Sequence, residues 1–224
     1  MLLRLFFACL VFTSSCVSPA RYGTYLAEYE AEGTAPVAAA SSIVLRYADD
    51  NRTGPEVQRI KNSFIPAILY WSWNNTLECS LDPEKQLAYV REGVIQAADS
   101  LGLERKLGGE KLSITLSQAP GQFYYVNRMY VVFAIVAYST MGEESITPVP
   151  TDLVASYAVT DGNDRRSAWG SATVFSQEEP MRNMWKGTRG FTRKFLDAQR
   201  AELQRMGREL IIDIDQELYP VSRK

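Results

Sequence analysis

The sequence predicts an α+β fold: an antiparallel-rich sheet with helices packed on one face, including a long C-terminal helix. Two stretches, one after Asp82 and one over residues 188–218, repeat apolar residues every three or four positions, which is typical of amphipathic helices. Between them lie alternating apolar and polar runs separated by turn sequences, which are typical of strands. Because these strands follow one another without intervening helices, the pattern favours α+β over α/β.

Local signals mark the ends of both helices. In the helix after Asp82, Asp82 is a good N-terminal cap and Pro83 stands at the first helical position, where proline is tolerated. Gly102 is a typical C-terminal stop. In the C-terminal helix, Gly207 interrupts the apolar stripe and predicts a kink. We expect this helix to cover the sheet and not to form a coiled coil. Its apolar side consists of Phe195, Leu196, Leu203, Met206, Leu210, Ile211, Ile214 and Leu218.

The strand signals between the two helices differ in strength. Alternation at Leu112, Ile114 and Leu116 predicts a half-buried strand. Residues 123–138 are apolar on both faces except near Asn127 and Arg128, where we expect a bend or bulge. The last two predicted strands, residues 153–160 and 167–175, form a hairpin around a turn at residues 161–164.

Before the first of these helices the pattern is more mixed. Residues 42–47 predict a strand that ends in a dense turn signal. A short helix is expected over Glu56–Asn62. Ile65–Trp73 is the most apolar stretch in the middle of the chain. Its alternation predicts a strand covered on both sides or a strand with one edge near a partner.

Trp71 and Trp73 share one face of that strand, beside Tyr70, and are candidate contact residues for a ligand or a partner. Exposed in a groove, such rings would stack on a sugar or an acyl chain. Alternatively, they fill the core, as large aromatic side chains usually do.

The first fifteen residues have the layout of a secretory signal peptide. Arg4 precedes an apolar run from Leu5 to Phe12, and small residues follow. The run is too short to span a bilayer, which takes about 20 residues. We expect residues 1–15 to be the signal, residues 16–42 to be an anchor and linker, and residues 43–224 to be one α+β domain.

Cys16 directly follows the small residues of this segment. The arrangement resembles the lipobox of bacterial lipoproteins, although Thr13 stands where the lipobox usually has Leu. The resemblance implies cleavage before Cys16 and attachment of acyl chains, such as palmitate, to it. Val17 stands where an Asp would retain the protein in the inner membrane, which implies the outer membrane. The alternative is an ordinary signal peptide cut elsewhere, which would leave Cys16 as a thiol.

Composition excludes several function classes. The chain has 24 basic and 26 acidic residues, so there is no basic excess to bind nucleic acid. It has no histidine, which excludes Ser-His-Asp and Cys-His catalysis and HExxH zinc sites. If the signal is removed and Cys16 is acylated, Cys79 is the one remaining thiol and no internal disulfide forms. We expect no cofactor, no metal and no catalytic residues.

The order of a sheet with two covering helices looks like that of small envelope lipoproteins that assist outer-membrane assembly or transport. This resemblance covers the signal and the element order, and it implies a non-enzymatic protein that faces the periplasm or the surface. It would be attached to the membrane through its lipid and would bind an envelope protein or lipid. One alternative is a sugar- or lipid-binding lipoprotein that uses the aromatic platform. Another is a carboxylate-dependent hydrolase with two acids facing each other in a cleft.

Overall fold

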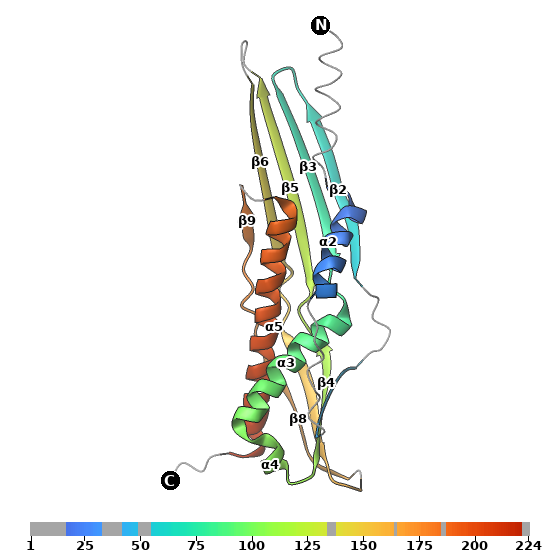
Figure 1. Ribbon diagram of the computed structural model, residues 1–224, viewed down its shortest axis with the longest axis vertical. Coiled ribbons are helices and arrows are strands. Elements are labelled where there is room, and N and C mark those ends of the chain that lie inside the picture. Colours follow the sequence, from blue (N-terminus) through green and yellow to red (C-terminus); the bar gives the residue numbers. More distant parts are fainter. Residues whose placement is uncertain are drawn as a thin grey trace.

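The computed structural model describes residues 17–32, 42–48, 55–133, 138–163, 165–184 and 187–220. These residues form an α+β fold with mostly antiparallel sheets and a long C-terminal helix, which confirms the predicted fold class (Figure 1). The strands are β1 (Ile43–Tyr47), β2 (Glu56–Pro66), β3 (Tyr70–Ser80), β4 (Lys111–Gln118), β5 (Gln122–Phe133), β6 (Tyr138–Pro148), β7 (Leu153–Thr160), β8 (Arg166–Val174) and β9 (Met181–Asn183). The helices are α2 (Pro19–Glu32), α3 (Pro83–Leu101), α4 (Leu103–Leu107) and α5 (Thr188–Leu218).

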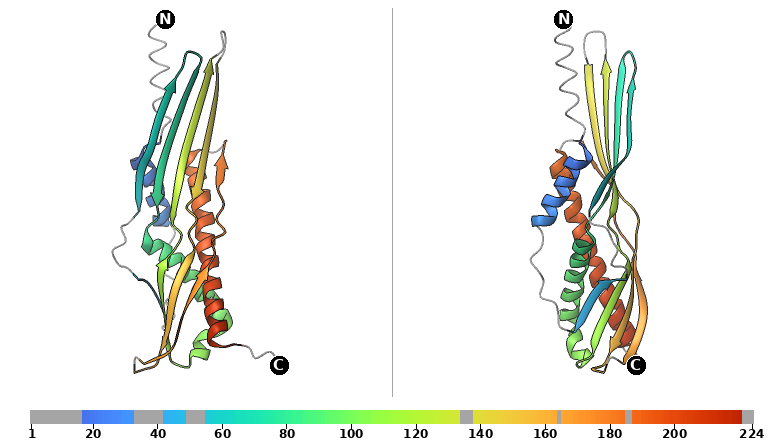
Figure 2. Two further views of the ribbon diagram at one scale, coloured as in Figure 1. Left: turned by 180° about the vertical axis from the view of Figure 1, so that it is seen from behind. Right: turned by 90° about the vertical axis from the view of Figure 1, so that its right-hand side faces the viewer.

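In the described part of the chain the strands form two sheets, with the orders β1-β4-β7-β8 and β2-β3-β5-β6-β9. Only β1 and β4 pair in parallel. Short connections join β4 to β5 and β6 to β7, so the chain passes twice from one sheet to the other. The two sheets lie end to end along the long axis of the molecule (Figures 1 and 2). The molecule is therefore elongated, and α4 lies near one end of it.

Helices α3 and α5 cover the shorter sheet and enclose the larger core. They pass each other at two glycines. A methyl group on Gly93 would collide with the backbone of Gln204, and one on Gly207 would collide with the backbone of Val90. Helix α5 runs unbroken through Gly207. This glycine therefore permits close approach of two helices, a role that its position in the sequence alone did not indicate.

Helix α2 lies within residues 16–42, which the sequence predicts to be an anchor and linker. It packs on β2 and α5, with the side chains of Tyr22 and Leu26 fully buried. The Tyr22 hydroxyl accepts a hydrogen bond from Thr192 (3.2 Å), and the Tyr29 hydroxyl donates one to Asp197 (2.8 Å). Residues 17–32 of the expected linker are therefore packed on the domain. Residues 16 and 33–41 lie outside the described residues.

Two local predictions around β2 and β3 were wrong. Residues 56–62 form the first part of strand β2 and not a helix, because their backbone pairs with β3 in an antiparallel ladder. The apolar stretch at residues 65–73 is not one strand but the end of β2, a turn and the start of β3. Of the bend or bulge expected near Asn127 and Arg128, the bulge was also wrong, since β5 keeps an unshifted register with β3 and β6 there.

Several other local predictions agree with the structure. Asp82 caps α3 by accepting a hydrogen bond from the Glu84 backbone amide (2.9 Å), and Gly102 ends the helix with a left-handed backbone (φ 61°). Strand β4 buries alternate residues, and β7 and β8 form the expected hairpin. Helix α5 spans the predicted residues. These features depend on short-range signals, which explains why they could be read from the sequence.

Candidate interaction surface

Strands β2, β3, β5 and β6 project well beyond the ends of α2 and α5 (Figure 2). We call the far part of this projection the tip: residues 64–73, which end β2 and begin β3, with residues 129–133 of β5 and 138–142 of β6. A turn after Pro66 joins β2 to β3 at the end of the tip. Residues 134–137, which lie between β5 and β6 in the sequence, are outside the described residues and read AIVA.

The tip carries no Asp, Glu, Lys or Arg. Its strands pair in five successive rows, from Trp73 opposite Met129 to Phe133 opposite Tyr138. At about 3.3 Å per residue, these rows span roughly 13 Å along the strands. Charged side chains begin directly below, at Arg128 opposite Glu143. The boundary between the charge-free tip and the charged part of the sheet is therefore sharp.

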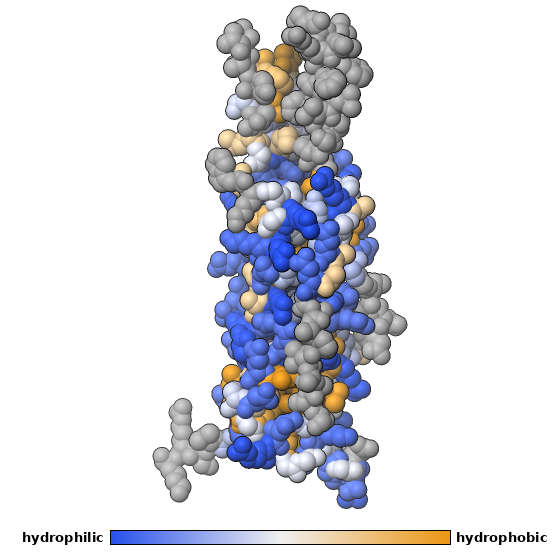
Figure 3. All heavy atoms as spheres, viewed as in Figure 1, coloured by the Kyte–Doolittle hydropathy of each residue, from blue (hydrophilic) through white to orange (hydrophobic). Residues whose placement is uncertain are grey.

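Large apolar side chains are exposed on the tip. Ile68 in the turn after Pro66 is 96% exposed. Figure 3 shows hydrophobic residues at this end of the molecule and a second group of them near the opposite end. Monomeric soluble proteins rarely leave such a contiguous patch uncovered, and a patch of this kind marks an interaction site. The other exposed large apolar residues of the tip are Phe64, Ile65, Leu69, Tyr70, Val132 and Met141.

The candidate residues Trp71 and Trp73 lie on the helix-side face of the tip and are half-buried. Their rings contact each other edge to face, with centroids 6.3 Å apart. Phe64 stacks on Trp73 at 4.7 Å, and Phe133 meets Trp71 edge to face at 4.9 Å. The four rings therefore form one cluster, in which neighbouring side chains occupy ring faces that a stacking platform would offer to a sugar.

Tyr70, the third candidate residue, lies on the opposite face of the sheet. It stacks on Tyr130 with ring centroids 6.1 Å apart. The three aromatic candidates, which are neighbours in the sequence, therefore lie on two different faces of the sheet. The two tryptophans continue the helix-side face, and Tyr70 points away from it because side chains alternate along a strand.

The N-terminal segment reaches the base of the tip. Val17 is buried, and its carbonyl accepts a hydrogen bond from the side-chain amide of Asn75 (3.2 Å). Asn75 lies on β3, two residues below Trp73. Cys16, the predicted site of lipid attachment, lies outside the described residues but precedes Val17 directly in the chain. The described chain therefore begins beside the middle of β3, at the base of the tip.

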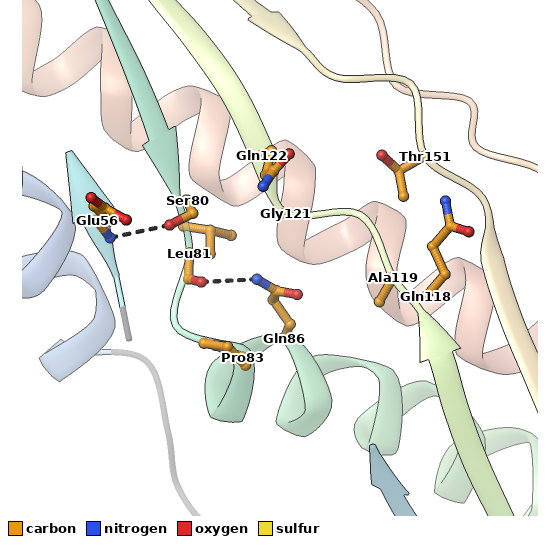
Figure 4. Close-up of a pocket in the computed structure, with 10 residues that line it drawn as sticks. All are labelled: Glu56, Ser80, Leu81, Pro83, Gln86, Gln118, Ala119, Gly121, Gln122 and Thr151. Atoms are coloured by element: carbon orange, nitrogen blue, oxygen red, sulfur yellow. Dashed lines mark hydrogen bonds between the residues drawn. The ribbon is translucent and has the colours of Figure 1, made fainter. Parts of the chain in front are cut away.

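A polar pocket of about 480 Å³ lies where the two sheets meet, near the start of α3 (Figure 4). Gln86 donates a hydrogen bond there to the carbonyl of Leu81 (2.9 Å) and accepts one from the Tyr47 hydroxyl (3.2 Å). Ser80 accepts a hydrogen bond from the Glu56 amide (3.1 Å). These hydrogen bonds join the strands to one another and to α3, so we interpret the pocket as a structural junction.

A second cavity, of about 270 Å³, is lined by three acids. Two are half-buried, Glu178 from the segment between β8 and β9 and Glu202 of α5, and the third, Glu179, is exposed. Neither oxygen of the Glu178 carboxylate has a hydrogen-bond partner. Burial, together with the charge of Glu202, raises the pKa of Glu178 to about 7. Both oxygens of Glu202 accept hydrogen bonds from Arg205, and one also accepts from the Gln177 amide. Hydrogen bonds from these groups lower the pKa of Glu202 against the opposing effect of burial.

The cavity therefore holds one acid whose pKa is raised to about 7 and one carboxylate fixed by an arginine. A glycosidase pair also combines a protonated acid with an ionised carboxylate. In such a pair, however, the ionised carboxylate must offer a free oxygen to water or to the sugar. Because both oxygens of Glu202 are already engaged, the geometry gives little support to hydrolysis here.

Other chemistry-bearing groups are scattered or buried. Across the described ranges, no group of three or more Cys, Asp and Glu side chains is placed to hold a metal ion. The Cys79 thiol is fully buried, and burial raises its pKa to about 12. Within the same residues, the helices are too short or too polar to span a bilayer.

Sequence reasoning singled out the tryptophans but missed the most exposed part of the tip. Ile68 and Leu69 were placed inside a covered strand, whereas they form a solvent-exposed turn. The available signal was the absence of charge over two long runs, residues 62–77 and 129–142. Two such runs would have indicated paired hairpins with apolar ends.

Comparisons of the chain with protein-family models, with curated proteins and with solved structures found no match.

Proposed function

We propose that this chain is a lipid-anchored, non-enzymatic protein of the outer membrane that binds an envelope component through the tip. The observation that supports it best is the tip itself: a projection about five residue rows long, without charge, with seven large apolar side chains exposed. A surface of this kind is stable in water only at a cost, which a binding partner removes.

The two alternatives have less support. A sugar-binding platform needs ring faces open in a groove, but Phe64 stacks on Trp73 and Phe133 packs on Trp71. A hydrolase needs a free carboxylate beside the protonated Glu178, and Glu202 is held by Arg205. Binding through the tip needs neither.

The anchor is tested by intact mass and membrane fractionation of the native protein beside a Cys16→Ala variant. We expect native protein to carry acyl mass and to sediment with membranes, and the variant to do neither. Unmodified, soluble protein in both cases would contradict the anchor.

The binding surface is tested by a photo-crosslinking amino acid placed at position 68 and, as a matched control, at position 169. Trp169 on β8 is also a strongly exposed apolar residue (73% exposed) but lies on the other sheet. We expect envelope material to be crosslinked from position 68 and not from position 169. Equal crosslinking from the two positions would show that the tip is not the binding surface.

A further inference from the structure

We infer that the tip inserts into the lipid leaflet that carries the acyl chains of Cys16, so that the protein is held in one membrane at two places. This inference rests on the lipid anchor proposed above and goes beyond it, because it names lipid as the component that covers the tip. Three features of the structure support it.

The first feature is position. The hydrogen bond from Asn75 fixes Val17 at the base of the tip, two residues below Trp73 on β3. Consecutive Cα atoms are about 3.8 Å apart, so an acyl chain on Cys16 starts within one residue of this fixed point. A leaflet that holds the lipid therefore lies at the same end of the molecule as the tip.

The second feature is the distribution of apolar side chains. They are exposed on both faces of the tip, with Phe64 on the helix-side face and Ile65 on the other, and at the turn through Ile68 and Leu69. A protein partner that covered one face would leave the other in water. A lipid leaflet surrounds a projection on every side, and it needs no complementary shape.

The third feature is the match between the tip and one leaflet. The charge-free rows span roughly 13 Å, and the hydrocarbon of one leaflet is about 15 Å deep. Trp71, Trp73, Tyr70 and Tyr130 lie within these rows, and such rings favour the interface between lipid and water. The first charged row, at Arg128 and Glu143, would then lie among the head groups.

The backbone sets a limit on the depth. The turn after Pro66 is closed by hydrogen bonds from the Ala67 amide to the Tyr70 carbonyl and from the Phe133 amide to the Leu69 carbonyl, both 2.8 Å. However, β2 is an edge strand, and β6 pairs with β9 only below the tip, at residues 144–146. Unpaired backbone groups are costly in hydrocarbon, so we expect insertion at the interface and no deeper than one leaflet.

This second attachment would orient the molecule. A lipid on a single residue leaves a domain free to tilt, whereas two attachments at one end hold the long axis away from the membrane. Helix α4 lies near the opposite end from the tip (Figure 1). The shorter sheet with α3 and α5 would therefore stand away from the membrane.

The test uses the mature chain, residues 16–224, with Cys16→Ala, so that acyl chains do not mask binding by the tip. Vesicles of phosphatidylethanolamine and phosphatidylglycerol are the probe, and flotation measures binding. The double variant Ile68→Asp, Leu69→Asp is compared with the control Trp169→Asp, which changes an exposed apolar residue on the other sheet. We expect the double variant to lose at least about tenfold in binding, and the control to bind like the parent.

Depth is measured separately with an environment-sensitive fluorophore at Ile68→Cys or at Trp169→Cys. We expect lipids brominated in the acyl chain to quench the label at position 68 only. Thermal unfolding of every variant shows whether it is folded, and since both turn residues are exposed, the double variant should unfold like the parent.

Three results would overturn the inference. In the first two, the parent chain does not bind vesicles, or the label at position 68 stays unquenched. In the third result the tip pairs with a second copy of the chain, seen as concentration-dependent association that the double variant loses. None of these results removes the proposed function if Cys16 is acylated and position 68 still crosslinks to an envelope protein. The proposed function fails by different results: no acyl mass on Cys16, or equal crosslinking from positions 68 and 169.

Discussion

The side-chain amide of Asn75 donates a hydrogen bond to the carbonyl of Val17, across 58 residues of sequence (3.2 Å). This contact joins the start of the described chain to the middle of β3. Together with the buried side chains of Tyr22 and Leu26, it makes α2 part of the folded domain. A lipid on Cys16 would therefore be attached close to the domain and not through a long flexible tether.

Replacing Asn75 with Ala should loosen the attachment of α2. The variant leaves the buried carbonyl of Val17 without its donor, at a cost of about 1–2 kcal/mol. We expect faster hydrogen exchange at the α2 amides, with a smaller effect on α3 and α5. Asn74→Ala is the matched control, because Asn74 is half-buried and lies on the opposite face of β3. Unchanged exchange in α2 would contradict the assigned role of Asn75.

Alanine at Gly93 or Gly207 should destabilise the protein, because the added methyl group meets the backbone of the facing helix. We expect each variant to lower the free energy of unfolding by about 2–3 kcal/mol, measured by denaturant titration. Gly190→Ala on the same α5 helix is the control. A methyl group there meets nothing, so the higher helix propensity of alanine should raise stability by up to about 1 kcal/mol. Similar effects at all three positions would show that the helices do not pack closely at the glycines.

Glu178→Gln should change how stability depends on pH. Burial and Glu202 raise the pKa of Glu178 from 4.5 to about 7, so between these values the folded state binds more protons than the unfolded state. The free energy of unfolding of the wild type therefore receives a contribution that falls as pH rises from about 4.5 to about 7. The variant lacks this contribution, which is on the order of 3 kcal/mol.

The difference in unfolding free energy between the Glu178→Gln variant and the wild type should therefore change with pH. It should favour the variant more above pH 8 than at pH 4. Denaturant titrations at both pH values measure this difference. Glu179→Gln, which changes the exposed neighbouring carboxylate, is the control and should not produce it. Parallel pH profiles for wild type and Glu178→Gln would rule out a buried, proton-retaining Glu178.

The Cys79 thiol should not react in the folded protein. It is fully buried, and burial raises its pKa to about 12, so almost no reactive thiolate is present near neutral pH. We expect alkylation at pH 8 to proceed only in denaturant, with the modified fraction read by mass spectrometry. A Cys79→Ser variant gives the background. Rapid modification of the native protein would show that the face between β3 and α2 is open.

The sequence by itself determined the elements whose signals are local. The cap at Asp82, the left-handed stop at Gly102, the alternation in β4 and the extent of α5 all follow from interactions within a few residues of each other. The fold class followed because it depends on the order of such elements. The absence of histidine and the balance of charge excluded function classes without any structure.

Only the tertiary structure decided what depends on residues far apart in the chain. Residues 56–62 became a strand because β3 offered a ladder of backbone partners, and Gly207 matters because Val90 of another helix lies against it. Exposure decided the candidate site in the same way. Ile68 and Leu69 look like core residues in the sequence, yet none of the described helices, α2 to α5, reaches the far end of the four strands to cover them (Figure 2). Apolar character is a property of each residue, whereas burial depends on which other elements pack against it.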